Sequence, residues 1–166
     1  MADENRLIKE QEDLCLTFNQ DEFEANKTRL NGDQRAAFER IEAAYETLIR
    51  SENSTRNVEN IDKDSDENNN KNGKPKPPPP QHTFFIDGPA GTGKTFLYSL
   101  LLERVRSSGH IALAVASSGI AALLMKGGRT AHSRFSIPIH INERSSCDMS
   151  PSSNQGELIQ RAKLIV

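Results

Sequence analysis

The residues best suited to chemistry form one short run, GPAGTGKT, from Gly88 to Thr95. The run lies between the apolar stretch TFFID and the helix-like stretch FLYSLLLERV, and it satisfies the spacing G-x-x-x-x-G-K-[ST]. Glycines at these positions let successive backbone N–H groups turn toward a phosphate at the positive end of a helix dipole. We therefore expect this loop to bind a nucleoside triphosphate.

Two residues of the loop would act on the phosphates directly. Lys94 supplies a positive charge for the β and γ phosphates, and the Thr95 hydroxyl is a ligand for Mg²⁺, so we assign catalytic roles to both. The alternative is a glycine-rich turn with an incidental lysine. The expected nucleotide-binding residues of the loop are Gly88, Pro89, Ala90, Gly91, Thr92, Gly93, Lys94 and Thr95.

The segments around the loop predict an α/β fold. HTFFID (82–87) and HIALAVAS (110–117) are typical of buried strands, and residues 94–109 between them predict a helix closed by Gly109. Continuous apolar strands joined by a helix indicate a parallel sheet covered on both faces. SGIAALLM (118–125) predicts a short helix, and GELIQRAKLIV (156–166) predicts a helix that runs into a third strand.

The first half of the chain predicts helices and a long linker. Residues 1–29 have scattered apolar positions that allow a surface helix. Residues 30–50 place apolar side chains on one helical face, which predicts a helix from about Asp33 to Arg50. Residues 51–81 have little apolar surface and end in a proline run, so we expect a disordered acidic and Pro-rich linker before a domain at 82–166.

Charge and cysteine content narrow the range of partners. Residues 1–81 hold 18 acids and 12 bases, whereas residues 82–147 hold 3 acids and 7 bases. The basic excess favours a phosphate-rich partner, although a solvated helix surface would show the same excess. Cys15 and Cys147 have neither disulfide-framework nor zinc-site spacing, and no apolar run approaches a membrane span. We expect no membrane contact and a reducing compartment.

Two further stretches and the loop together resemble one family. LNGDQRAAFERI (30–41) resembles a glutamine motif, and ASSGIAALLMKGGRTAHSRFSIP (116–138) resembles the second and third motifs of the PIF-type DNA helicases. These are relatives of the bacterial RecD subunit in helicase superfamily one, and the resemblance is closest to their plant, transposon-associated branch. It implies a P-loop NTPase fold in which residues 82–166 form part of a RecA-like domain.

The resemblance also implies roles outside the loop. Gln34 would read the adenine of ATP through its amide. Without the resemblance, Gln34 would be interpreted as an exposed polar residue on the first turn of a helix. Without the resemblance, the serines of the second and third motifs would be interpreted as helix caps and His132 as a structural histidine. Phe135 would fit either the hydrophobic core or a stack on a DNA base. The residues implied to contact single-stranded or forked DNA are Ser117, Ser118, Gly119, Thr130, His132, Ser133 and Phe135.

The family's activity is ATP-dependent 5′-to-3′ DNA unwinding with ATP and Mg²⁺, in DNA repair, recombination and telomere maintenance. The N-terminus shows no targeting signal, and we expect a nuclear location, with the mitochondrion or cytoplasm as alternatives. The acids that ordinarily complete the Mg²⁺ site would come after a strand such as AKLIV, so we expect a fragment limited to ATP binding. A non-catalytic helicase remnant and a small P-loop phosphotransferase are the two alternative functions.

Overall fold

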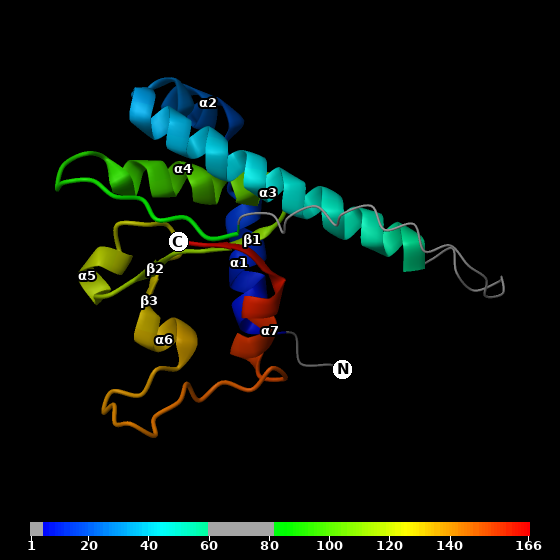
Figure 1. Cartoon of the computed structure of the whole chain (residues 1–166), viewed down its shortest axis with the longest axis vertical. Coiled ribbons are helices and arrows are strands. Elements are labelled where there is room, and N and C mark those ends of the chain that lie inside the picture. Colours follow the sequence, from blue (N-terminus) through cyan, green and yellow to red (C-terminus); the bar gives the residue numbers. More distant parts are fainter. Residues whose placement is uncertain (1–4, 60–81) are drawn as a thin grey trace, which may run out of the picture.

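The computed structural model describes residues 5–59 and 82–166, which form helices around short parallel strands (Figure 1). The helices are α1 (Arg6–Leu16), α2 (Gln20–Thr28), α3 (Gly32–Glu59), α4 (Lys94–Ser107), α5 (Gly119–Ala122), α6 (Ala131–Phe135) and α7 (Asn154–Arg161). The strands are β1 (Ile111–Leu113), β2 (Val115–Ala116), β3 (Arg129–Thr130) and β4 (Ala162–Ile165). The predicted mixed α/β architecture is confirmed.

The strands pair in parallel, as expected from their apolar sequences. The predicted strand HIALAVAS is divided into β1 and β2, which pair with β4 and β3 respectively. The register places Ala112 opposite Leu164 and Ala116 opposite Thr130. The chain therefore brings the segments that follow β2 and β3 to one edge, because parallel strands end on the same side of a sheet.

Alternate residues of β1 belong to two different apolar clusters. Ala112 packs with Leu102 and Val105 of α4 and with Tyr45 of α3. Ile111 and Leu113 pack on the other side, with Ile8 of α1 and Leu158 of α7. Since successive strand residues point to opposite faces, β1 is covered on both faces by helices. The expected cover of helices on both faces is therefore found at β1, although the strands form two separate two-stranded sheets.

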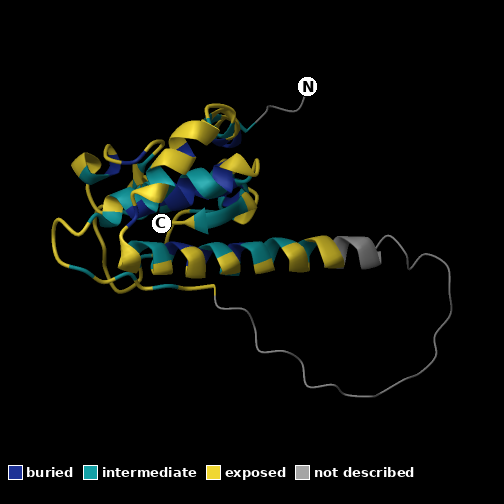
Figure 2. Ribbon diagram, turned by 90° about the horizontal axis from the view of Figure 1, so that it is seen from above, coloured by how far each residue is buried: buried dark blue, intermediate teal, exposed yellow. Residues whose placement is uncertain are grey.

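Helix α3 is longer than predicted and runs along one side of the molecule (Figure 2). It begins at Gly32, close to the expected start, but it continues to Glu59 instead of ending near Arg50. The sequence SENSTRNVE after Arg50 contains no glycine or proline to stop a helix, and Glu52 forms an ion pair with Lys163 of β4 at 2.7 Å. The rest of the predicted linker, residues 60–81, lies outside the described residues.

The segment 82–87 is not the buried strand that HTFFID predicts. Its side chains alternate as in a strand: Phe84 and Ile86 are half-buried against the core, whereas Phe85 is 92% exposed. However, the backbone from Phe84 to Asp87 forms no hydrogen bond with any described residue. A cavity of about 530 Å³ is lined by this segment and by Leu164 and Ile165 of β4, and β4 does not pair with the segment.

Helix α5 is shorter than SGIAALLM predicts, because the chain turns back sharply after it. The helix ends at Ala122, and the chain then passes close to the helix end at Gly128. A side chain at Gly128 would place its Cβ 2.1 Å from the carbonyl oxygen of Ala122. Only glycine allows this contact, which leads the chain directly into β3.

We predict that Leu158→Ala lowers the free energy of unfolding by about 2–5 kcal/mol, because it leaves a cavity at a fully buried site. Urea unfolding of the purified chain measures this change. The matched control is Leu123→Ala, at a residue that is 85% exposed, which should change stability by less than about 0.5 kcal/mol. Equal effects of the two substitutions would contradict the packing of α7 on β1.

Candidate nucleotide and nucleic-acid site

The phosphate loop presents a run of unpaired backbone donors. No backbone N–H group from Ala90 to Phe96 donates a hydrogen bond to another described residue. Gly91 and Gly93 adopt φ angles of 82° and 79°, which curl the chain just before α4 begins at Lys94. Unpaired N–H groups at a helix start attract anions, because the helix dipole adds partial positive charge there. The loop therefore has the chemistry of a phosphate site.

Lys94 is turned back into the loop. Its Nζ donates hydrogen bonds to the carbonyl oxygens of Gly88 at 2.6 Å and of Pro89 at 2.8 Å. The ammonium group thus lies beside the unpaired N–H groups and holds the beginning of the loop to its end. An incoming phosphate would offer the lysine a charged acceptor in place of two neutral ones, and hydrogen bonds between charged groups are the stronger kind.

The loop also fits a magnesium ion that arrives with the nucleotide. Thr95 is exposed, and its hydroxyl makes no hydrogen bond to a described residue. A hydroxyl oxygen of this kind suits Mg²⁺, which keeps most of its ligands from water and phosphate oxygens. Within residues 5–59 and 82–166, no group of three or more His, Cys, Asp or Glu side chains could hold a metal ion.

Gln34 lies against the loop, although the two are 58 residues apart in the sequence. Its Nε2 donates to the carbonyl oxygen of Thr92 at 2.9 Å, and its Oε1 accepts from the backbone N–H of Asn31 at 3.1 Å. The structure thus brings the predicted adenine-reading residue to the predicted phosphate loop. Both polar ends of its amide are already engaged by the protein.

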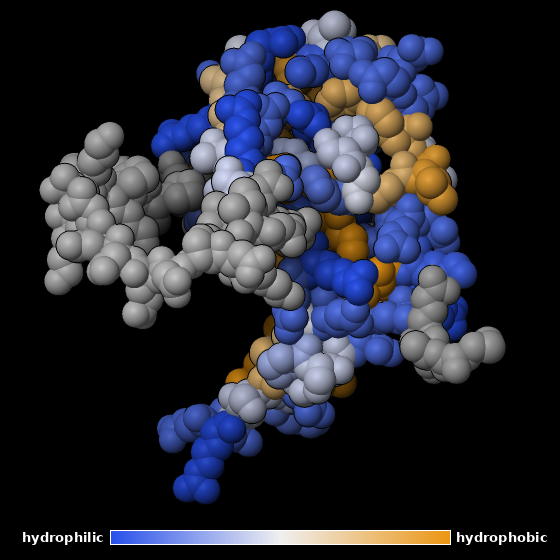
Figure 3. All heavy atoms as spheres, turned by 90° about the vertical axis from the view of Figure 1, so that its right-hand side faces the viewer, coloured by the Kyte–Doolittle hydropathy of each residue, from blue (hydrophilic) through white to orange (hydrophobic). Residues whose placement is uncertain are grey.

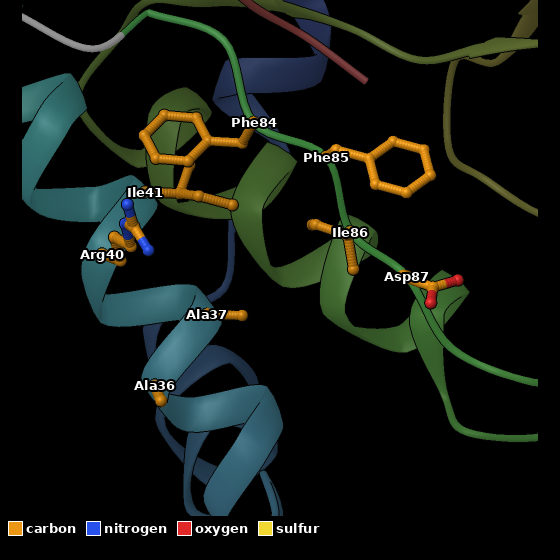
Figure 4. Close-up of a pocket in the computed structure, with 8 residues that line it drawn as sticks. All are labelled: Ala36, Ala37, Arg40, Ile41, Phe84, Phe85, Ile86 and Asp87. Carbon is orange, nitrogen blue, oxygen red and sulfur yellow. The ribbon is translucent and has the colours of Figure 1, made fainter.

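A cavity of about 370 Å³ lies between the start of α3 and the loop. Its lining includes Asp33, Gln34, Asp87 and Lys94, so one wall comes from α3 and the other from the loop. A second cavity, of about 330 Å³, adjoins it along α3 and shares Ala37 and Asp87 with it. Figure 4 shows this second cavity, with Phe84 and Ile86 directed toward α3 and Phe85 directed away.

The predicted DNA-contacting residues come together at the ends of β2 and β3. The register pairs Ala116 with Thr130, so Ser117 and Ser118 lie next to the start of α6. Ser118 caps α5 by accepting from Ala121 N–H at 3.3 Å, and Thr130 caps α6 by accepting from Ser133 N–H at 3.2 Å. These two hydroxyls therefore do act as helix caps. The phosphate loop and α5 lie on the same side of the molecule in Figure 1.

The remaining predicted DNA contacts differ in exposure. Ser117, Gly119, His132 and Ser133 are exposed, whereas Phe135 is half-buried. The carbonyl oxygen of Ser133 accepts a hydrogen bond from Gln155 Nε2 at 2.7 Å, which fixes α6 to α7. The exposed groups form a small polar surface suited to a phosphate backbone.

The basic excess of residues 82–147 is weaker at this surface than the sequence suggests. Arg134 is 2% exposed, and burial together with nearby Arg129 lowers the pKa of its guanidinium. Arg129 forms an ion pair with Glu10 of α1 at 2.7 Å. Arg104 is likewise paired, with Glu42 and Glu46 of α3. Much of the positive charge therefore stabilises the fold. Figure 3 shows the other side of the molecule, the right-hand side of Figure 1, whose described residues are mostly hydrophilic.

Sequence reasoning did not identify two acidic residues at the cavity between α3 and the loop. Asp33 lies on the first turn of α3, and Asp87 ends the segment before the loop; both line the 370 Å³ cavity. Asp33 was predicted only as a helix-start residue. The position of Asp87 directly before the glycine-rich run is the one sequence signal that could have placed it near the phosphates.

Comparison with known protein families matches residues 79–166 to the PIF1-like helicases. The match covers more than half of the chain and includes the phosphate loop and both predicted DNA motifs. The chain belongs to the PIF1-like helicase family.

A search of curated proteins finds no match to the chain. No described helix is long and apolar enough to cross a membrane.

The close fit of Gln34 to this family's phosphate loop makes Gly93 a sensitive position. A Cβ at Gly93 would lie 2.4 Å from Gln34 Nε2, and the positive φ is unfavourable for alanine by about 1–2 kcal/mol. We predict that Gly93→Ala lowers the free energy of unfolding by at least that amount in urea titrations. Gly32→Ala is the control, because a Cβ there meets nothing within 4 Å. Equal stability of the two variants would refute the close fit.

Proposed function

We propose that this PIF1-like helicase chain binds Mg²⁺-ATP at the loop from Gly88 to Thr95, as the nucleotide-binding part of a DNA helicase. The observation that carries the proposal is the run of unpaired N–H groups from Ala90 to Phe96 at the start of α4. Family membership supports the use of ATP rather than another phosphate compound. The arrangement suits a P-loop NTPase fold, with the loop at one end of a buried helix.

The proposed binding step exchanges one set of contacts for another. The Lys94 ammonium leaves the carbonyl oxygens of Gly88 and Pro89 and meets the β and γ phosphates, while the backbone N–H groups of the loop donate to phosphate oxygens. Thr95 would ligate the Mg²⁺ that accompanies the nucleotide. That ion neutralises phosphate charge and orients the triphosphate.

The proposed DNA contact uses the polar surface at the ends of β2 and β3. Ser117, Gly119 and His132 are exposed there and would donate hydrogen bonds to a single strand, while Phe135 is partly accessible for base stacking. In helicases of this kind, ATP hydrolysis would be coupled to 5′-to-3′ unwinding in repair, recombination or telomere maintenance. Such work would place the protein in the nucleus, or in the mitochondrion.

We predict that Lys94→Ala weakens Mg²⁺-ATP binding by at least tenfold, because the variant loses the charge that meets the β and γ phosphates. Equilibrium titration with a fluorescent ATP analogue measures the dissociation constant. Lys126→Ala is the matched control, because Lys126 is an exposed lysine whose Nζ bonds Thr17. An unchanged affinity in the Lys94 variant would refute the assignment of the loop.

We predict that Ser117→Asp weakens binding of a single-stranded oligonucleotide about three- to tenfold, because a carboxylate would repel the phosphate backbone. Fluorescence anisotropy at low salt measures the affinity. Ser152→Asp, at an exposed loop position, adds the same charge elsewhere. Equal weakening by both substitutions would show that net charge alone sets the affinity and would contradict a contact at β2.

A further inference from the structure

The start of α3 is closed by two reciprocal hydrogen bonds. The Oδ1 of Asn31 accepts from the backbone N–H of Gln34 at 2.9 Å, and the Oε1 of Gln34 accepts from the backbone N–H of Asn31 at 3.1 Å. This is the capping-box arrangement, in which residues three apart satisfy each other's free donors. It fixes the orientation of the Gln34 amide, because the oxygen must face Asn31 and the NH₂ group must face outward.

The outward NH₂ group meets the phosphate loop and not open solvent. Gln34 Nε2 donates to the carbonyl oxygen of Thr92 at 2.9 Å. The Thr92 hydroxyl donates in turn to the carbonyl oxygen of Pro89 at 2.9 Å, so the contact extends across the loop. The absence of a side chain at Gly93 leaves the room that the amide occupies.

The hydrogen bond to the Thr92 carbonyl also sets the direction of the Gly93 backbone N–H, a donor available to phosphate. The Thr92 C=O and the Gly93 N–H belong to one planar trans peptide, so they point in opposite directions. With the carbonyl directed at Gln34, the Gly93 N–H is directed away from α3. That N–H is one of the unpaired donors between Ala90 and Phe96.

The bond to Thr92 leaves room for a contact between Gln34 and a base. The NH₂ group has a second N–H and the amide oxygen a second lone pair beyond those engaged by Thr92 and Asn31. The bond to Thr92 forms in the chain without any ligand. The geometry thus gives Gln34 a task in addition to base reading, one that does not require a base.

We propose that Gln34 is a positioning residue for the phosphate loop: it holds the Thr92 carbonyl and thereby orients the backbone donors that bind the phosphates. This inference rests on the proposed function of the loop as a nucleotide site. It predicts that Gln34 contributes to affinity even for a ligand that has phosphates but no base. It also couples α3 to the loop, because displacement of the helix start would release the Thr92 carbonyl.

The test compares Gln34→Ala with the wild-type chain for three ligands, each with Mg²⁺: ATP, GTP and inorganic tripolyphosphate. We expect the substitution to weaken all three, and to weaken tripolyphosphate, which has no base, by about three- to tenfold, the loss of one hydrogen bond. Glu39→Ala, at an exposed position of the same helix, is the control and should leave all three affinities unchanged. Weakening of ATP alone, or of none of the three, would overturn the proposal.

A second measurement does not depend on ligand binding. In the ligand-free chain, NMR relaxation should show that Gln34→Ala lowers the backbone order parameters of Thr92 and Gly93 and leaves those of α4 unchanged. A merely structural role at the start of α3 would not loosen these two residues selectively. If the wild-type chain bound none of the ligands, the proposed function would fail. If the order parameters of Thr92 and Gly93 were unchanged in Gln34→Ala, the positioning role would be overturned separately.

Discussion

The start of α4 is held in place by the burial of the helix, and this constraint determines the chemistry of the loop before it. Leu97, Leu100 and Leu101 pack against α2 and α3, and Leu102 and Val105 pack against β1. Because these contacts fix the helix, the N–H groups at its beginning cannot rotate toward carbonyl partners. They remain available to a ligand, at the end of the helix where the dipole favours negative charge.

The loop and α3 form one unit through contacts that are distant in the sequence. Arg104 of α4 bonds Glu46 of α3 at 3.2 Å near one end of the helix pair, and Gln34 bonds Thr92 near the other. The glutamine motif and the phosphate loop are thereby held at a fixed distance, with the 370 Å³ cavity between them. This explains why a glutamine 58 residues before Thr92 belongs to the same site.

The sequence predicted the elements whose signals are local. The helix at 94–107, the parallel strands at 111–116 and 162–165, and the phosphate loop all follow from periodicity, glycine spacing and apolar runs. The family could also be predicted from the sequence, because three of its motifs occur in the expected order, and the family comparison confirms it. The roles assigned to individual residues in nucleotide binding, catalysis and DNA contact remain predictions.

Properties that depend on distant neighbours could not be read from the sequence. HTFFID has every local feature of a strand, yet Phe85 is exposed because no described strand pairs beside it. Arg134 counts as a positive charge in the sequence, but the fold buries it beside Gly127. Local propensity cannot reveal these outcomes, since packing partners decide both.

The most direct test of the account is an NMR titration of the ¹⁵N-labelled chain with Mg²⁺-ATP. The account predicts that the largest amide shifts fall between Ala90 and Phe96, because these N–H groups gain phosphate acceptors on binding. Smaller shifts should appear at Gln34. Saturable binding whose shifts lie elsewhere, or the absence of any shift in the loop at millimolar nucleotide, would contradict the claim that these donors form the nucleotide site.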